Sequence, residues 1–243
     1  MFLENKKGIK EVVMDYARLI EEAFAQLNEV DDFCEEYAES FGEELMDIFC
    51  YYLHVNDAHY GYGASKFVIW FDSDKNYVYK IPFKVKYNEY YGEEGYPDEW
   101  EFVELEYDYC KREANLYEAI EEKDEEIAKL FFLKTEVIRK LRDGYLLYRQ
   151  TACCSCGVEY SGRKSLYKES IKKATGYNQH LENLLPTEFF DLIFKVYTTE
   201  AENLISRLVK LVDSLDINDI HRNNVGFTAI GTPVIFDYSG YYG

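Results

Sequence analysis

The chain has 243 residues, enough for one large domain or two small lobes, and 47% of them are hydrophobic, so we expect a folded core. Its 46 acidic and 27 basic residues give a net charge of -19, which disfavours direct binding to nucleic acid but is compatible with an acidic mimic of DNA. No apolar run approaches the roughly 20 residues of a membrane helix, and residues 1–7 lack the apolar core of a signal peptide, so we expect a cytoplasmic protein without a membrane segment.

Residues 1–55 are expected to form a helical extension. Apolar side chains recur there every three or four positions in two separate runs, which is the spacing of an amphipathic helix. The runs are Val13, Tyr16, Ala17, Ile20, Phe24 and Leu27, and then Cys34, Tyr37, Phe41, Leu45, Ile48 and Tyr52. Two helices that each bury one apolar face are therefore predicted.

A β-hairpin is predicted next. Residues 67–71 and 77–83 are rich in β-branched and aromatic side chains, and residues 72–76 between them have the composition of a turn.

Lys80 lies in the second strand of this hairpin. Alternation places it on the opposite face from Tyr79 and Ile81. On an edge strand the lysine would lie in water, whereas facing inward it would need an anionic partner, because burying an unpaired ammonium group is costly. Glu113, on a helix predicted at 111–122, is our candidate partner, and Glu118 is the alternative.

Residues 89–108 combine many acidic and aromatic side chains and contain no basic residue. Such a run is predicted to be a solvated insertion or, alternatively, a surface that docks a basic protein partner.

The second half of the chain contains further predicted elements. They are strands at 130–137, 145–149, 225–227 and 233–236, and one long helix that starts at Pro186 and continues to Leu215.

The six cysteines are irregularly spaced, so we expect reduced thiols and no disulfide framework. Cys153, Cys154 and Cys156 form a cluster, but adjacent cysteines rarely both face one metal ion, and a zinc site would need His180 or Cys110 to complete it. Packed thiols are the favoured interpretation.

The oxygen-bearing side chains of Asp219, Asn224 and Asp237 predict a magnesium site. The short hairpin that follows Asn224 returns the chain to Asp237, so these two side chains are expected to lie side by side, with Asp219 close by. Carboxylate and amide oxygens are ligands that suit Mg²⁺. The alternative is that these residue types simply populate turns.

The order of these features resembles the protein-kinase-like superfamily. A glycine-containing loop at 61–65, a strand lysine and a helix glutamate are followed by the spacing Asp-x-His-x-x-Asn, from Asp219 to Asn224, and by a hairpin that ends at Asp237. The loop spacing is most similar to the aminoglycoside phosphotransferase and choline-kinase branch and to compact bacterial or phage kinase-like proteins. The resemblance implies an α+β, two-lobed kinase-like fold with a truncated C-terminal lobe. The implied domains are the N-terminal helical extension at 1–55, the N-lobe at 56–152 and the reduced C-lobe at 153–243.

The resemblance implies that the first lobe binds ATP. Gly61, Gly63 and Ser65 would cover the phosphates, Lys80 would bind the α- and β-phosphates, and Glu113 would hold Lys80 in place.

The other implied roles concern adenine, the metal ion and the proton. Gln150 and Ala152 would lie in the hinge that binds adenine through its backbone. Asn224 and Asp237 would hold Mg²⁺, and Asp219 would accept or orient the proton of the attacking hydroxyl. The implied function is an ATP- and Mg²⁺-dependent phosphotransferase that acts on an unidentified hydroxyl acceptor.

Departures from the family pattern support a second interpretation. Ile217 and Asn218 precede Asp219 where the family commonly has His and then Arg or Gly, and Gly240 stands one position later than in the Asp-Phe-Gly pattern. The residues after Asp237 are too few to form the helices on which protein kinases dock a peptide. The alternative is a catalytically inactive pseudokinase that serves as a nucleotide-binding or protein-interaction module.

Overall fold

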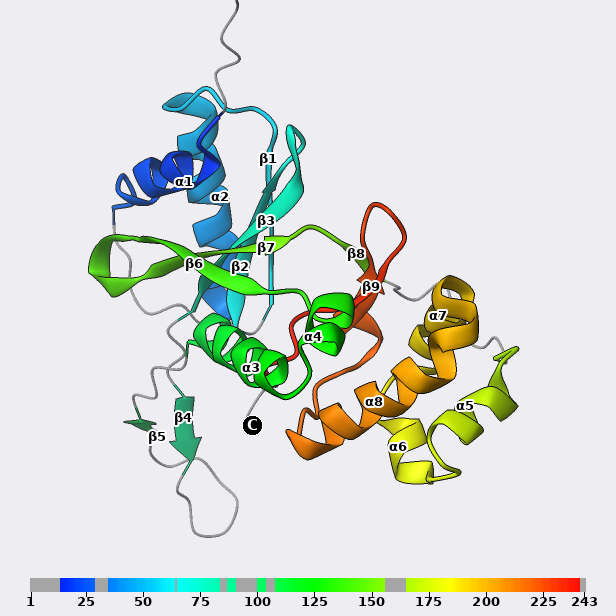
Figure 1. The fold of residues 1–243 in the computed structure, drawn as a ribbon. Helices are drawn as coiled ribbons and strands as arrows, with labels where there is room; N and C mark the ends of the chain where they lie inside the picture. The colour runs from blue at the N-terminus through cyan, green and yellow to red at the C-terminus, as the bar shows by residue number, and fades with distance from the viewer. Residues whose placement is uncertain are drawn as a thin grey trace, which may run out of the picture.

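The structure, a computed structural model, describes residues 14–28, 35–63, 65–83, 87–90, 100–103, 108–155 and 165–240. A five-stranded antiparallel sheet and two groups of helices enclose two hydrophobic cores (Figure 1), which confirms the expected α+β class. Within these ranges, no helix has the length and apolar character that crossing a membrane requires.

The five-stranded sheet organises the first core. In spatial order its strands are β1 (Ala58–Tyr62), β2 (Lys66–Phe71), β3 (Asp74–Pro82), β7 (Leu146–Thr151) and β6 (Thr135–Lys140). The predicted hairpin is confirmed as β2 and β3, although β3 begins at Asp74 and the turn is shorter than expected. The sequence prediction missed β1. Its sequence, Ala-His-Tyr-Gly-Tyr, shows no clear alternation of apolar and polar side chains, and the strand is recognised by its pairing with β2.

The two predicted N-terminal helices are α1 (Tyr16–Phe24) and α2 (Glu35–Tyr51). They pack on one face of the sheet, where Ile20 and Phe24 share a core with Phe67 of β2 and Ile81 of β3. Burial of such side chains is the main stabilising contribution to folding. The helical extension is therefore part of the first core.

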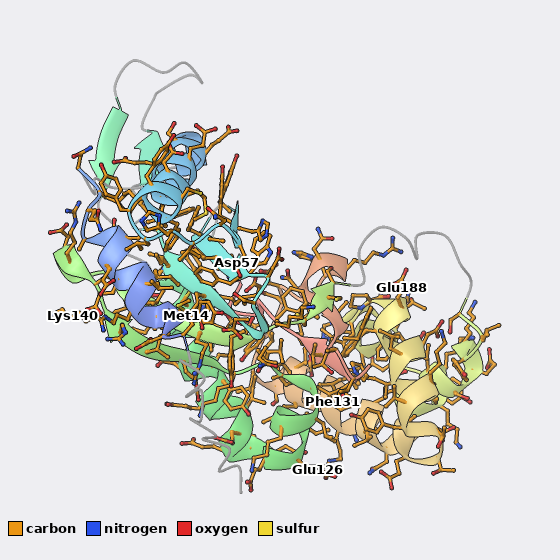
Figure 2. All side chains as sticks on the ribbon, turned by 90° about the horizontal axis from the view of Figure 1, so that it is seen from above. Met14, Asp57, Glu126, Phe131, Lys140 and Glu188 are labelled. Atoms are coloured by element: carbon orange, nitrogen blue, oxygen red, sulfur yellow. The ribbon has the colours of Figure 1, made fainter. Side chains whose placement is uncertain are left out.

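Two central helices, α3 (Tyr109–Lys123) and α4 (Glu125–Phe131), connect this half to the second core. Phe131 of α4 faces the C-terminal helices (Figure 2), with its ring 6.2 Å from that of Phe189 and 5.6 Å from that of Tyr197. Because Tyr117 and Ile120 of α3 are buried in the same core, α3 is fixed between the sheet and the C-terminal half.

The strand predicted at 130–137 is wrong in its first half, because α4 runs to Phe131 and β6 begins only at Thr135. Asp124 caps α4 by accepting a hydrogen bond from the backbone N–H of Ile127 at 3.1 Å. Glu125 lies in the first turn, where negative charge stabilises the helix. The first part of the apolar run therefore completes a short helix whose buried residues include Ile127 and Phe131.

The C-terminal half is mainly helical. Its elements are α5 (Lys168–Ala174), α6 (Gln179–Asn183), α7 (Thr187–Tyr197), α8 (Ala201–Ser214), β9 (Val225–Phe227) and β10 (Pro233–Ile235). The two short strands are confirmed, and β8 (Cys154–Ser155) pairs with β9 as a third strand. The single long helix predicted from Pro186 is instead α7 and α8, because Thr198 has a φ of 40°, which an α-helix does not tolerate.

Most of the acidic and aromatic stretch at 89–108 lies outside the described residues. β4 (Tyr87–Tyr90) and β5 (Trp100–Val103) pair with each other as a two-stranded antiparallel ribbon. Its role as a solvated insertion or a docking surface stays a prediction.

Gly226 of β9 lies very close to the backbone of the paired strand β8, so a substitution there tests the pairing of the small C-terminal sheet. A Cβ atom there would lie 2.0 Å from the carbonyl oxygen of Cys154 on the paired strand β8. A backbone carbonyl, unlike the end of a flexible side chain, cannot move away from the added Cβ without disturbing the strand. We therefore expect Gly226→Ala to lower the free energy of unfolding by about 1–3 kcal/mol, measured by urea denaturation. Gly63→Ala is the matched control, since nothing lies within 4 Å of its added Cβ. Equal losses in the two variants would contradict the expectation.

Candidate active site

Lys80 and Glu113 meet as predicted. Lys80 is buried in β3, on the face opposite Tyr79 and Ile81, which belong to the first core. Its Nζ lies 3.4 Å from Oε2 of Glu113, and the side chains are 3% and 0% exposed. The alternative partner, Glu118, is exposed on α3. The pair therefore joins the sheet to α3 in a place that excludes water.

Asp237 joins the same cluster from the far end of the chain. Its Oδ1 accepts a hydrogen bond of 2.6 Å from Nζ of Lys80. The Nζ of Lys66, in β2, lies 2.9 Å from the same oxygen. Asp237 follows β10 with a φ of 52°, a conformation uncommon outside glycine and the short polar residues. Lys66 was missed by the sequence prediction, although alternation in the hairpin places it on the same face as Lys80.

Glu113 connects the two halves of the cluster. Its Oε1 accepts a hydrogen bond of 2.9 Å from the backbone N–H of Asp237 and one of 3.0 Å from Nε2 of Gln150. Gln150 also donates to the hydroxyl of Thr135 and to the carbonyl of Leu133. The side chain of Gln150 is therefore part of the cluster, within β7 and between β3 and β6, and adenine binding by its backbone stays a prediction.

The charges of this cluster stabilise one another. Burial alone raises the pKa of Asp237, but the ammonium groups of Lys80 and Lys66 outweigh it and hold the pKa well below its ordinary value. Burial alone lowers the pKa of Lys80, but Glu113 and Asp237 raise that pKa above the ordinary value. At neutral pH the ammonium groups and the carboxylate of Asp237 are thus all charged.

Asn224 ties the loop that contains Asp219 to the segment at Asp237. It lies at the end of the 3₁₀ turn η4 (Arg222–Asn224). Its Nδ2 donates to the backbone carbonyl of Asp219 at 2.8 Å and to that of Asp237 at 3.1 Å. Since the nitrogen makes both bonds, the side-chain oxygen is the atom that Asn224 can offer to a ligand. The predicted juxtaposition of Asn224 and Asp237 is confirmed.

Asp219 is partly exposed, with 32% of its side chain accessible, and lies 3.7 Å from Nε2 of His221. Burial raises the pKa of Asp219, and the ammonium group of Lys66 is among the groups that oppose this effect. The Nδ1 of His221 accepts a hydrogen bond from the backbone N–H of Asn223, so this histidine braces the loop beside Asp219. A partly exposed carboxylate with a raised pKa suits proton acceptance.

The glycine-containing loop forms the turn between β1 and β2. Gly61 lies within β1, and the backbone N–H of Gly63 donates to the carbonyl of Lys66 at 3.1 Å. The carbonyl of Ser65 accepts from the N–H of Phe83, at the end of β3. These three residues therefore lie at the edge of the sheet next to Lys66. Phosphate binding by them stays a prediction.

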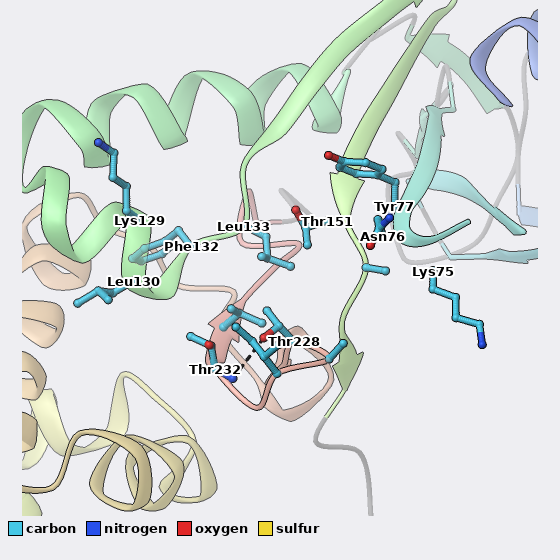
Figure 3. A pocket seen from close by; sticks show the side chains of 14 residues that line it. Lys75, Asn76, Tyr77, Lys129, Leu130, Phe132, Leu133, Thr151, Thr228 and Thr232 are labelled. Atoms are coloured by element: carbon cyan, nitrogen blue, oxygen red, sulfur yellow. Dashed lines mark hydrogen bonds between the residues drawn. The ribbon is translucent and has the colours of Figure 1, made fainter. Parts of the chain in front are cut away.

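Ala152 lies just after β7, and its backbone N–H already donates to the carbonyl of Asn76 at 2.8 Å. Its side chain lines a cavity of about 460 Å³ that Figure 3 shows between Tyr77, Leu133 and the turn at Thr228. Neither Lys80 nor Asp237 contributes to this cavity. A backbone contact of Ala152 with adenine would therefore use its carbonyl.

The donor set near Asp237 suits a hard cation. Within the part of the chain that the structure describes, both lysines bind Oδ1 of Asp237, which leaves Oδ2, together with the oxygen of Asn224, for Mg²⁺. No cluster of three or more His, Cys, Asp or Glu side chains with metal-binding geometry occurs among the described residues. Asparagine is not one of these four residue types, so a site formed by Asp237 and Asn224 would not count as such a cluster.

The cysteine cluster gives no support to a zinc site. Cys156 lies outside the described residues, and His180 is hydrogen-bonded to Asp213 at 2.7 Å. Burial raises the pKa of Cys110 to about 12, so this side chain offers no thiolate at neutral pH.

Comparison with models of protein families, with curated proteins and with solved structures found no match to this chain.

Proposed function

We propose that this protein is a kinase-like phosphotransferase that uses ATP and Mg²⁺ and acts on a hydroxyl acceptor. The observation that carries the proposal is the 2.6 Å contact between Lys80 and Asp237, which are 157 positions apart in sequence. A buried lysine held by a helix glutamate and an aspartate after a hairpin is the arrangement that the kinase resemblance implies.

The architecture supports the same proposal. A twisted antiparallel sheet with α3 against it would be the small lobe, and the helices with β9 and β10 would be the reduced second lobe. The turn at Gly61 and Gly63 adds a further point. A Cβ at Gly61 would make only ordinary contacts and one at Gly63 would make none, so packing does not demand either glycine. Close approach of a phosphate to the backbone is a reason for both.

The proposed chemistry is mainly positioning and charge neutralisation. Lys80 would bind phosphate oxygens while Glu113 keeps its ammonium group in place. Asp237 and Asn224 would hold Mg²⁺, which supplies positive charge at the transferred phosphoryl group when bound. Asp219 would take the proton that the acceptor hydroxyl loses as its oxygen bonds to the γ-phosphorus and ADP leaves.

A second candidate is a catalytically inactive nucleotide-binding module. It is favoured by the contacts of Lys66 and Lys80 with one oxygen of Asp237, since these contacts compete with metal binding by the same carboxylate. This module would bind nucleotide without transferring phosphate.

The test common to both candidates is thermal denaturation with and without ATP and Mg²⁺. At a ligand concentration near 100 times the Kd, we expect the midpoint to rise by about 5–10 °C, because a ligand that binds only the folded state stabilises it. Lys80→Met is expected to abolish most of this rise. Lys111→Met, an exposed lysine of α3, is the matched control. If the wild-type midpoint does not move, both nucleotide-dependent proposals fail.

A further inference from the structure

Lys66 is a buried cation that the roles described above leave unassigned. It is the first residue of β2 and follows the turn that contains Gly63. Its side chain is 10% exposed, and among the described residues its ion-pair partner is Asp237. A buried ion pair is weak evidence for a contribution to stability, because desolvation offsets the attraction. Stability alone therefore does not explain a lysine at this position.

The geometry around Asp237 is that of two cations sharing one anionic oxygen. The Nζ atoms of Lys66 and Lys80 lie 2.9 Å and 2.6 Å from the same Oδ1. Two ammonium groups that converge in this way repel each other, and the carboxylates of Asp237 and Glu113 balance their two charges. Lys80 has a second carboxylate in Glu113, at 3.4 Å, whereas the structure pairs Lys66 with Asp237 alone among the described carboxylates. Lys66 is thus the cation with fewer carboxylate partners, and it shares its partner with Lys80.

The position of Lys66 points to where an anionic ligand would lie. In the β2–β3 register, Lys66 is opposite Pro82 and Val68 is opposite Lys80, so the two lysines are diagonal neighbours on one face of the sheet. The same strand end adjoins the turn at Gly63, where the backbone is open. A polyphosphate that runs beneath this turn would meet Lys66 and Lys80 in succession.

We propose that Lys66 and Lys80 form a two-lysine site for a nucleotide polyphosphate, in which the carboxylate of Asp237 occupies the place of a phosphate oxygen until nucleotide binds. The inference rests on the proposed function and assigns Lys66 as a second phosphate-binding residue. Phosphate oxygens take over both ammonium groups, and Asp237 is released to hold the metal ion.

The test compares binding of ATP and of adenosine, both with Mg²⁺, by isothermal titration calorimetry. Lys66→Met is expected to weaken ATP binding at least tenfold and to leave adenosine binding unchanged, because adenosine has no phosphate. Lys66→Arg should retain part of the ATP affinity, since it keeps the charge. Lys140→Met is the matched control, because Lys140 is an exposed lysine at the end of β6 in the same sheet.

The outcomes separate this inference from the proposed function. If wild-type protein does not bind ATP, the proposed function itself fails. If wild-type protein binds ATP and Lys66→Met binds it equally well, or loses adenosine and ATP to the same extent, the two-lysine site is overturned while the phosphotransferase proposal stands.

A second measurement needs no variant and covers the case in which Lys66→Met does not fold. Tripolyphosphate alone is expected to raise the thermal midpoint of the wild-type protein and to compete with ATP. Failure of tripolyphosphate to compete in a protein that binds ATP would overturn the two-lysine site.

Discussion

Glu113→Gln is expected to lower the free energy of unfolding by about 3–5 kcal/mol, because it removes one member of a buried charge cluster and leaves its cation undercompensated. Glu113 is 0% exposed and balances Lys80, while Asp237 faces two ammonium groups at once. The side-chain NH₂ group of the glutamine would also face another donor. It would point either toward the ammonium group of Lys80, or toward the backbone N–H of Asp237 and Nε2 of Gln150. Urea denaturation at neutral pH measures the loss.

Two further variants make this expectation specific. Glu118→Gln, on the exposed side of the same helix, should be nearly neutral. The double variant Glu113→Gln with Lys80→Met restores the balance between Lys66 and Asp237, so its loss should be smaller than the sum of the single losses by about 0.5–3 kcal/mol. Strict additivity, or a loss for Glu113→Gln as small as that of the control, would show that the cluster is not coupled.

Asp219→Asn is expected to reduce phosphoryl transfer by about 10²- to 10⁴-fold while leaving the stabilisation by ATP intact. The loop at Asp219 is held by the hydrogen bond that Nδ2 of Asn224 donates to the backbone carbonyl of Asp219, and this bond does not depend on the Asp219 carboxylate. The variant should therefore lose the proton acceptor and keep the geometry. Autophosphorylation and phosphate release from labelled ATP measure the rate. A measurable rate that stays unchanged in the variant would contradict Asp219 as the proton acceptor. No measurable transfer by a wild-type protein that ATP stabilises would favour the inactive nucleotide-binding module.

The same residue predicts the pH dependence of the reaction. Burial raises the pKa of Asp219, and a base must be unprotonated to act. The rate should therefore fall as the pH is lowered through a pKa that lies above the ordinary value of 3.8 for Asp. Asp216→Asn, an exposed neighbour, is the control and should keep both the rate and its pH profile. A wild-type profile that is flat down to pH 3.8 would contradict Asp219 as the base.

The two residue pairs of the site that the sequence predicted are Lys80 with Glu113 and Asn224 with Asp237. Both predictions rest on patterns that extend over a few neighbouring residues. Alternation within one strand placed Lys80 away from the first core, and the cost of a buried ammonium group required a carboxylate such as Glu113. The length of one short hairpin brought Asn224 beside Asp237. In each case a period or a turn, both readable over a few residues, decides where the side chain points.

The missed features depend on contacts between distant segments. Lys66 at the start of a strand resembles an ordinary exposed end until Asp237 is placed beside it. The place of the Gln150 side chain in the cluster was also missed, because the neighbours that bury it come from β6 and α3. The run at 130–133 has the composition of a strand, but its first two residues belong to α4, where Phe131 packs against Phe189 and Tyr197.

The amino-acid sequence by itself determined the α+β class, the N-terminal helices, the hairpin of Lys80 and the two short strands before Asp237, because periodicity and turn composition act over neighbouring residues. Only the tertiary structure decided that Lys66 and Lys80 share one oxygen of Asp237 and that Glu113 links them to Gln150. The physical reason is that the charge and hydrogen-bonding needs of buried groups are met by whichever segments the two cores bring together, and no local pattern specifies that choice.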